Sequence, residues 1–258
     1  MSAIQQIISS IGTGKAKIGD SWTRLLTGVL TPGYYATGMS ADGRYMVATL
    51  VDGSLIRSTD FGVSWSTVQG ANCMAIQSCA VSDSGQYMYI PDVSGNNLIR
   101  TSSDYGVSWL TRSPGANRQY RSIACSSDGS KVLACQTISG YVSRSTDYGN
   151  TWSNLSPELG DYQSICSSAD GTKLAFVADY GYIYTSSDSG ANWVERTGPG
   201  AREWRSIACS SDGTKLVACV WQHGYAYIST DSGGTWTAVS LPTSDGSYYS
   251  NVSCSGIS

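Results

Sequence analysis

The side chains best suited to chemistry in this sequence are aromatic residues followed by an arginine, a glutamine or a second aromatic residue. The aromatic positions are Tyr34, Tyr120, Tyr162, Trp204 and Tyr248, and the residues after them are Tyr35, Arg121, Gln163, Arg205 and Tyr249. Trp221 and His223, the only histidine, follow Trp204 in the same stretch. Exposed aromatic faces beside polar groups are suited to stacking on a sugar ring or to a protein hot spot. Mutual packing of the aromatic rings is the alternative interpretation.

Carboxylates that could act as general acids or bases are scattered over predicted loops. They are Asp52, Asp92, Asp161, Asp179 and Glu203. Hydrolysis of a glycosidic bond needs two carboxylates at a defined separation, and no spacing in the sequence singles out a pair. We therefore predict no catalytic residue, and we expect neither a metal site nor a cofactor.

The composition excludes several classes of partner. Charged residues make up 14% of the 258 residues, the net charge is −3, and no basic cluster is present, which argues against nucleic-acid binding. The sequence contains no run of 18 apolar residues, the length needed to span a membrane as a helix. The start of the sequence lacks the features of a signal peptide, so we expect synthesis in the cytoplasm. The eight cysteines are expected to be free, buried thiols, because Cys125 and Cys209 share one repeat position and Cys135 and Cys219 share another.

The elements that position these side chains belong to an internal repeat. Six tryptophans recur at intervals of 41 to 44 residues: Trp22, Trp65, Trp109, Trp152, Trp193 and Trp236. Five of them follow one turn motif, which reads Ser-Thr-Asp-Phe-Gly-Val-Ser before Trp65. The aspartates of the five copies are Asp60, Asp104, Asp147, Asp188 and Asp231. The aspartate can accept hydrogen bonds across the turn and the glycine allows a positive φ, so we assign the motif a structural role.

This motif resembles the Asp-box, or bacterial neuraminidase repeat, of sialidase-like β-propellers. A second turn precedes each box by about 20 residues, as in Asp128-Gly129, and is typical of a β-hairpin. Each repeat is thus expected to form four antiparallel strands, called a to d from the centre outward, which is one propeller blade. The a–b and c–d turns would share one face, the turn face. The b–c loops and the connections from d to the next a would share the other, the loop face.

We predict an all-β protein that forms a single six-bladed β-propeller over residues 1–258. The closing blade would combine residues from about 1–26 with residues 246–258, because Tyr248–Cys254 resembles Tyr120–Cys125 and Trp22 continues the ladder. A short amphipathic helix or anchor over residues 1–12 is the alternative.

The resemblance implies three functions. Sialidase-like enzymes use an arginine triad, a Tyr/Glu nucleophile pair and an aspartic acid, but the match covers only the repeats and the Arg-Ile-Pro motif is missing. A non-enzymatic module that binds a glycan or a protein surface through the variable loop face is favoured. A structural or receptor-binding component of a virus (phage) particle, part of a larger assembly, is the other alternative.

Overall fold

The computed structural model describes residues 34–68, 78–92, 98–115, 119–137, 140–155, 160–221 and 225–240. These residues form twenty β-strands and no helix, so the described part of the chain is all-β, as predicted. The strands form five antiparallel groups of four.

The first three groups are separate four-stranded sheets, in which each strand pairs with the next along the chain. The first contains β1 (Tyr34–Met39), β2 (Met46–Leu50), β3 (Leu55–Ser58) and β4 (Ser66–Thr67). The second contains β5 (Ala80–Val81), β6 (Met88–Asp92), β7 (Leu98–Ser102) and β8 (Leu110–Arg112). The third contains β9 (Gln119–Cys125), β10 (Val132–Thr137), β11 (Val142–Ser145) and β12 (Ser153–Leu155).

The fourth and fifth groups are joined into an eight-stranded sheet by pairing between β14 and β17. The fourth contains β13 (Tyr162–Ser167), β14 (Leu174–Gly181), β15 (Ile183–Ser186) and β16 (Val194–Arg196). The fifth contains β17 (Arg202–Cys209), β18 (Leu216–Val220), β19 (Tyr225–Ser229) and β20 (Thr237–Ser240).

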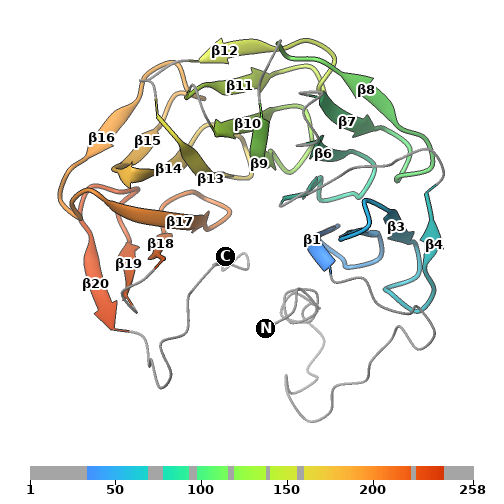
Figure 1. Ribbon diagram of the computed structural model, residues 1–258, viewed down its shortest axis with the longest axis horizontal. Helices are drawn as coiled ribbons and strands as arrows, with labels where there is room; N and C mark the ends of the chain where they lie inside the picture. Colours follow the sequence, from blue (N-terminus) through green and yellow to red (C-terminus); the bar gives the residue numbers. More distant parts are fainter. Residues whose placement is uncertain are drawn as a thin grey trace.

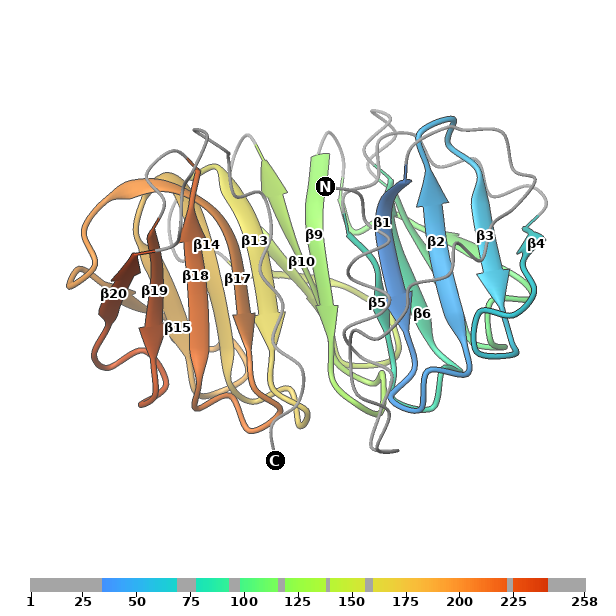
Figure 2. The same ribbon diagram turned by 90° about the horizontal axis from the view of Figure 1, so that it is seen from below.

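The five groups lie around a common centre, as the blades of a β-propeller do (Figure 1). In the third group, for example, β9 lies nearest the centre and β12 at the outer edge. The strands run nearly parallel to the central axis, with the turn face at the lower edge of the view in Figure 2. We call the groups blades 1 to 5. The predicted sixth blade, with Trp22 and Tyr248, falls outside the described residues.

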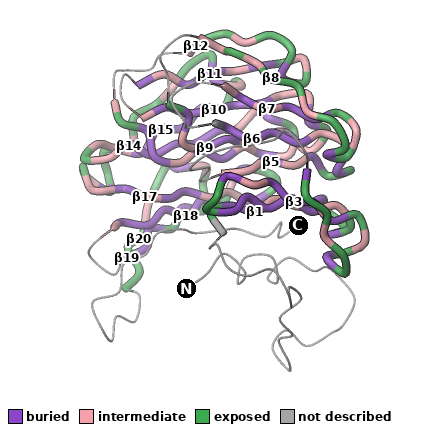
Figure 3. Tube along the Cα trace, turned by 45° about the vertical axis from the view of Figure 1, so that its right-hand side comes forward, coloured by how far each residue is buried: buried purple, intermediate pink, exposed green. Residues whose placement is uncertain are grey.

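The apolar cores lie between adjacent blades, because each sheet buries both faces of its inner strands (Figure 3). One cluster joins Val47 and Leu55 of blade 1 to Met88 of blade 2, and Trp109 packs against it. Trp152, Trp193 and Trp236 pack in the same way against the next three clusters. The ladder tryptophans thus wedge between blades, and the outer strand begins one residue after each of them.

The box aspartates tie each c–d turn together. Asp147 Oδ1 accepts from the Thr151 amide at 2.8 Å and from Ser145 Oγ at 2.8 Å, and its Oδ2 accepts from Thr151 Oγ1. The same bonds recur at Asp60, Asp104 and Asp231, and at Asp188 with Asn192 as the donor residue. Both carboxylate oxygens of each of these aspartates thus accept hydrogen bonds within their own turn.

Backbone hydrogen bonds also link the a–b turns of successive blades. Ala41 N donates to Asp83 O at 3.0 Å, Asp83 N to Ser127 O at 2.8 Å, and the same bond recurs between Ser127 and Ala169 and between Ala169 and Ser211. Equivalent residues of the a–b turns are therefore joined from blade to blade by backbone hydrogen bonds, which form a continuous series on the turn face.

The six cysteines of the described residues are free thiols, as predicted. Cys135, Cys166 and Cys219 are buried, whereas Cys79, Cys125 and Cys209 are only partly buried, which differs from the prediction. Burial raises the pKa of the Cys135 thiol to about 12, so this group is an inert part of the core. No helix long and apolar enough to cross a membrane occurs in the part of the chain that the structure describes.

Candidate functional site

A β-bulge recurs near the start of the innermost strand in four blades. In blade 5, Trp204 is opposite Val220 and Ser206 is opposite Cys219, so Arg205 is the extra residue. The same shift leaves Tyr35, Arg121 and Gln163 as the extra residues of blades 1, 3 and 4. Bulges re-aim a side chain and are frequent near binding sites. The extra residue is thus the one after each aromatic position, and its exposure differs between blades: Tyr35 is 43% exposed, whereas Gln163 is buried.

The aromatic residues themselves point into the cores, which corrects the expectation that they are exposed at the mouth of the channel. Trp204 and Tyr120 are 0% exposed and Tyr162 is 1% exposed. The Trp204 indole donates to Gly181 O at 3.1 Å and meets the Tyr227 ring edge-on. Side chains alternate along a strand, so the residue before each bulge faces a neighbouring blade. These three aromatic residues belong to the packing and have no free face for a ligand.

Arg205 connects blades 4 and 5 through polar contacts. Its Nη1 donates to Gln163 Oε1 at 2.9 Å and lies 3.9 Å from Asp179 Oδ2. The amide of Gln163 in turn donates from Nε2 to Asp161 Oδ1 at 2.9 Å. The Arg205 guanidinium also covers the Trp221 ring, with Cζ 4.5 Å from its centre, which is a cation–π contact. Arg205 is therefore fixed in position while its side chain remains 24% exposed.

Tyr180 is the most exposed aromatic side chain near Arg205. It is 73% exposed and has a φ of +51°, which is unfavourable for a residue with a Cβ. The Glu203 carboxylate beside its hydroxyl raises the pKa of Tyr180. The register of β14 and β17 explains the contact, because Asp179 is opposite Glu203 across the pairing that joins the blades.

We call these residues the Arg205 cluster, and its members are Asp161, Gln163, Asp179, Tyr180, Glu203, Arg205 and Trp221. Burial raises the pKa of Asp179, with Asp161 and Glu203 acting in the same direction and Arg205 opposing them. Nearby, burial and the charge of Arg205 lower the pKa of Arg121. The cluster therefore holds a dense set of charges in a partly desolvated setting.

Three buried polar atoms in the Arg205 cluster have no hydrogen-bond partner among the described residues. They are Asp179 Oδ1, Glu203 Oε2 and Arg205 Nε. Buried polar groups are nearly always satisfied by protein, water or ligand. The cluster can thus offer two carboxylate acceptors and one cationic donor to a bound molecule.

The remaining predicted residues divide between described and undescribed parts of the chain. Tyr34 lies in β1, whereas His223 and Tyr248 fall outside the described residues. The sequence pattern singled out neither Tyr180 nor a pairing of Asp179 with Glu203. Both depend on the length of β14, where Asp179, Tyr180 and Gly181 extend the strand beyond its equivalent β10, and this extension is seen only in the structure. No group of three metal-ligating side chains that could hold an ion occurs in the described ranges.

Neither a family model nor a curated protein sequence matches this chain. Solved structures do match its fold. A GH74 enzyme from Niastella koreensis aligns with a TM-score of 0.63 and 16% identity over 80% of this chain and 38% of that one. An ancestral GH74 enzyme gives 0.65 and 17% over 80% of this chain and 31% of that one. This chain thus matches well under half the length of these two enzymes.

A structure of a nidogen/laminin complex aligns with a TM-score of 0.66 and 13% identity, over 85% of this chain and 84% of that one. At such low identity these likenesses show the fold alone. They indicate a β-propeller-like, all-β architecture, in agreement with the sheet order.

Proposed function

We propose that this chain is a non-enzymatic binding propeller that recognises a glycan through its loop face at the Arg205 cluster. The observation that carries the proposal is the exposed, strained Tyr180 beside Glu203, next to an arginine held against Trp221. A ligand that contacts Tyr180 also lies beside the polar atoms of the cluster.

The chemistry of the cluster favours a polyhydroxylated ligand. A sugar ring has an apolar face that can stack on an aromatic side chain and hydroxyls that both donate and accept hydrogen bonds. Among the described residues, Asp179 Oδ1 and Glu203 Oε2 have no hydrogen-bond donor and Arg205 Nε has no acceptor. Sugar hydroxyls can meet both needs without adding a net charge to the site.

A glycan array tests the proposal. The wild-type protein is expected to bind a defined set of glycans, and Trp221→Ala is expected to abolish most of the signal, because Arg205 loses the ring that supports it. Phe61→Ala is the matched control, since Phe61 is 55% exposed but lies in the box turn of blade 1. A blank array, or equal losses in both variants, would contradict the proposal. Release of a cleaved sugar would instead indicate a hydrolase.

We further propose that the ring is completed by a sixth blade formed by residues 1–26 and 246–258. The proposal rests on the resemblance of Tyr248–Cys254 to Tyr120–Cys125 and on Trp22, which continues the regular spacing of the tryptophans. Such a blade would continue the series of turn-face backbone bonds, whose last described acceptor is Ser211 O. Deleting residues 1–12 should then lower the melting temperature of the whole propeller, whereas an unchanged melting temperature would favour a separate anchor.

A further inference from the structure

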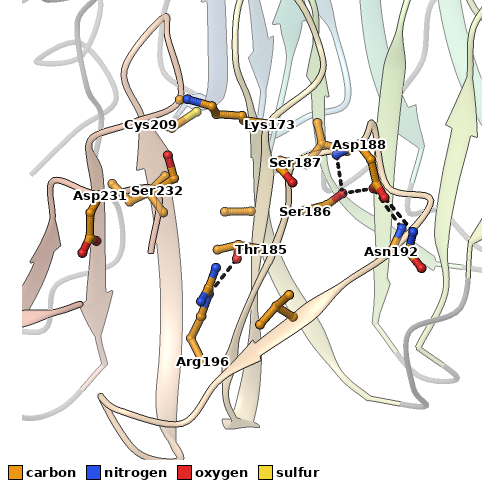
Figure 4. Close-up of a pocket in the computed structure, with 15 residues that line it drawn as sticks. Lys173, Thr185, Ser186, Ser187, Asp188, Asn192, Arg196, Cys209, Asp231 and Ser232 are labelled. Carbon is orange, nitrogen blue, oxygen red and sulfur yellow. Dashed lines mark hydrogen bonds between the residues drawn. The ribbon is translucent and has the colours of Figure 1, made fainter. Parts of the chain in front are cut away.

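A cavity of about 150 Å³ lies between blades 4 and 5, separate from the Arg205 cluster (Figure 4). Leu174, Ala175 and Thr185 of blade 4 form one side, and Cys209 and Asp231 of blade 5 belong to the other. The cavity is partly open to solvent. Its volume is enough for a molecule of about six to eight non-hydrogen atoms, since an engineered cavity of about 150 Å³ holds benzene.

The other three described interfaces between adjacent blades, here called seams, are each crossed by a long side chain. That side chain comes from one of two repeat positions, one on the second strand and one on the third strand of a blade. Between blades 2 and 3, Tyr89 is fully buried and its hydroxyl donates to Gly129 O at 2.7 Å. Arg57 of blade 1 donates to Tyr105 O at 3.1 Å, and Arg144 of blade 3 donates to Ser189 O at 2.8 Å. Each of these side chains fills its seam and ties a blade to the next box turn or hairpin turn.

Blade 4 carries small side chains at both positions. The strand pairing that sets Tyr89 opposite Thr101 sets Ala175 opposite Thr185, and the pairing of Leu133 with Arg144 is its equivalent in blade 3. Ala175 is too short to reach blade 5, and Thr185 replaces the bridging arginine. The cavity is therefore the space that a larger side chain occupies in the other seams.

Arg196 supplies the charge in this space. Its guanidinium points into the cavity in Figure 4, and its Nε donates to Thr185 Oγ1 at 2.8 Å. Arg112, the equivalent residue of blade 2, instead donates to Asn150 Oδ1 at 2.8 Å, a partner that blade 5 lacks because Gly234 stands there. Arg196 thus has no carboxamide partner in the next turn.

The aspartates that line the cavity already accept hydrogen bonds within their own turns. Asp231 accepts from the Thr235 amide at 2.8 Å and from Thr235 Oγ1 at 2.7 Å, and Asp188 accepts from the Asn192 amide and side chain. Lys173 is the second cation that lines the cavity. The two cations and the two ionised aspartates of the lining balance in charge. The aspartate oxygens accept hydrogen bonds within their own turns, so the Arg196 guanidinium is the charged group that can bind a ligand here.

We propose that this cavity binds a small carboxylate, of the size of a hydroxy acid. The carboxylate would accept hydrogen bonds from the Arg196 guanidinium, a pairing that suits the planar geometry of both groups. Hydroxyl groups of the ligand would face Thr185 and Ser232, and its carbon chain would lie against Ala175 and Leu216. The site is independent of glycan binding at the loop face.

Thermal unfolding and NMR titration of the full chain test this proposal, with L-lactate as the probe and lactamide as its uncharged analogue at constant ionic strength. Lactate is expected to raise the melting temperature and to shift a local set of resonances saturably, whereas lactamide is not. Arg196→Gln should weaken lactate binding at least tenfold, and Arg112→Gln, the matched control in blade 2, should leave it unchanged.

A second variant fills the cavity. Ala175→Tyr copies Tyr89, so its hydroxyl is placed to donate to Gly213 O as Tyr89 does to Gly129 O. It should abolish lactate binding while the ligand-free protein keeps or gains thermal stability. Lack of a saturable effect in the wild-type protein would overturn the proposal. Undiminished lactate binding in Arg196→Gln, which removes the guanidinium, would overturn it as well, whether or not Ala175→Tyr folds.

Discussion

Arg205 of blade 5 donates from Nη1 to Gln163 Oε1 of blade 4 at 2.9 Å, across the seam between their innermost strands. Both residues are the extra residues of β-bulges at the same repeat position. The hydrogen bond joins the two bulges, and the Trp221 ring lies against the Arg205 guanidinium. A repeated irregularity of the backbone thus assembles the Arg205 cluster from two neighbouring blades.

Replacing Trp204 is expected to damage the fold rather than a binding surface. The indole is 0% exposed and its Nε1 donates to Gly181 O, so Trp204→Ala leaves a large cavity and an unpaired carbonyl. A buried Trp→Ala change costs about 3–5 kcal/mol of unfolding free energy. Urea denaturation measures the loss, and a change below about 1 kcal/mol would show that the indole is not part of the core.

Tyr180→Gly should separate stability from binding. Glycine adopts positive φ without the cost of about 1–2 kcal/mol that a side chain incurs there, so the melting temperature should hold or rise. Glycan binding should fall at least tenfold, because the exposed ring is gone. Phe61→Gly is the matched control, since Phe61 also has a φ of 60° and is exposed, but it lies on the turn face. Equal binding by both variants would remove Tyr180 from the site.

Asp179→Asn should stabilise the protein at neutral pH and not in acid. Burial, Asp161 and Glu203 raise the pKa of Asp179 in the folded state. A carboxyl with a raised folded pKa opposes folding once pH rises through that value, and this penalty vanishes below the unfolded pKa, where both states are protonated. The difference in melting temperature between variant and wild type should therefore shrink from pH 7 to pH 3. A constant difference would contradict the assigned shift.

The box aspartates should make the fold sensitive to strong acid. Hydrogen bonds from Thr151 lower the pKa of Asp147 to about 2, and those from Asn192 do the same for Asp188. A depressed folded pKa gives stability that is complete above the ordinary value of 3.8 and is lost as pH falls toward 2. Asp147→Asn should flatten the loss of melting temperature between pH 4 and pH 2. An identical pH profile for the variant would contradict this role.

The repeat made the blades predictable from the sequence. Tryptophan spacing and the two turn motifs specify where each hairpin reverses, and the structure has strands on both sides of each described turn. The turn motif of the repeat has a strict local chemistry, in which Asp60 and its equivalents accept hydrogen bonds from nearby groups, so a short-range pattern was enough to predict it.

The candidate site was less predictable because it depends on register. In the sequence, an aromatic residue followed by arginine looks like two candidate ligand-binding residues. Consecutive side chains of a strand point to opposite sides of the sheet, however, and a bulge changes the direction of the second side chain. The Trp204 side chain is therefore buried in the core, whereas the Arg205 side chain is partly exposed. Tyr180 and Glu203 meet only through the β14–β17 pairing between blades, which leaves no local pattern in the sequence.

The most direct test of glycan binding at the Arg205 cluster is an NMR titration of the tryptophan indole N–H resonances with the strongest glycan from the array. The proposal predicts a saturable shift of the Trp221 indole signal, because its ring supports Arg205 at the site. The signals of Trp65, Trp109 and Trp152, whose indoles donate to glycine carbonyls of their own box turns, should not move. An unchanged Trp221 signal at saturation, with shifts at the box tryptophans, would contradict it.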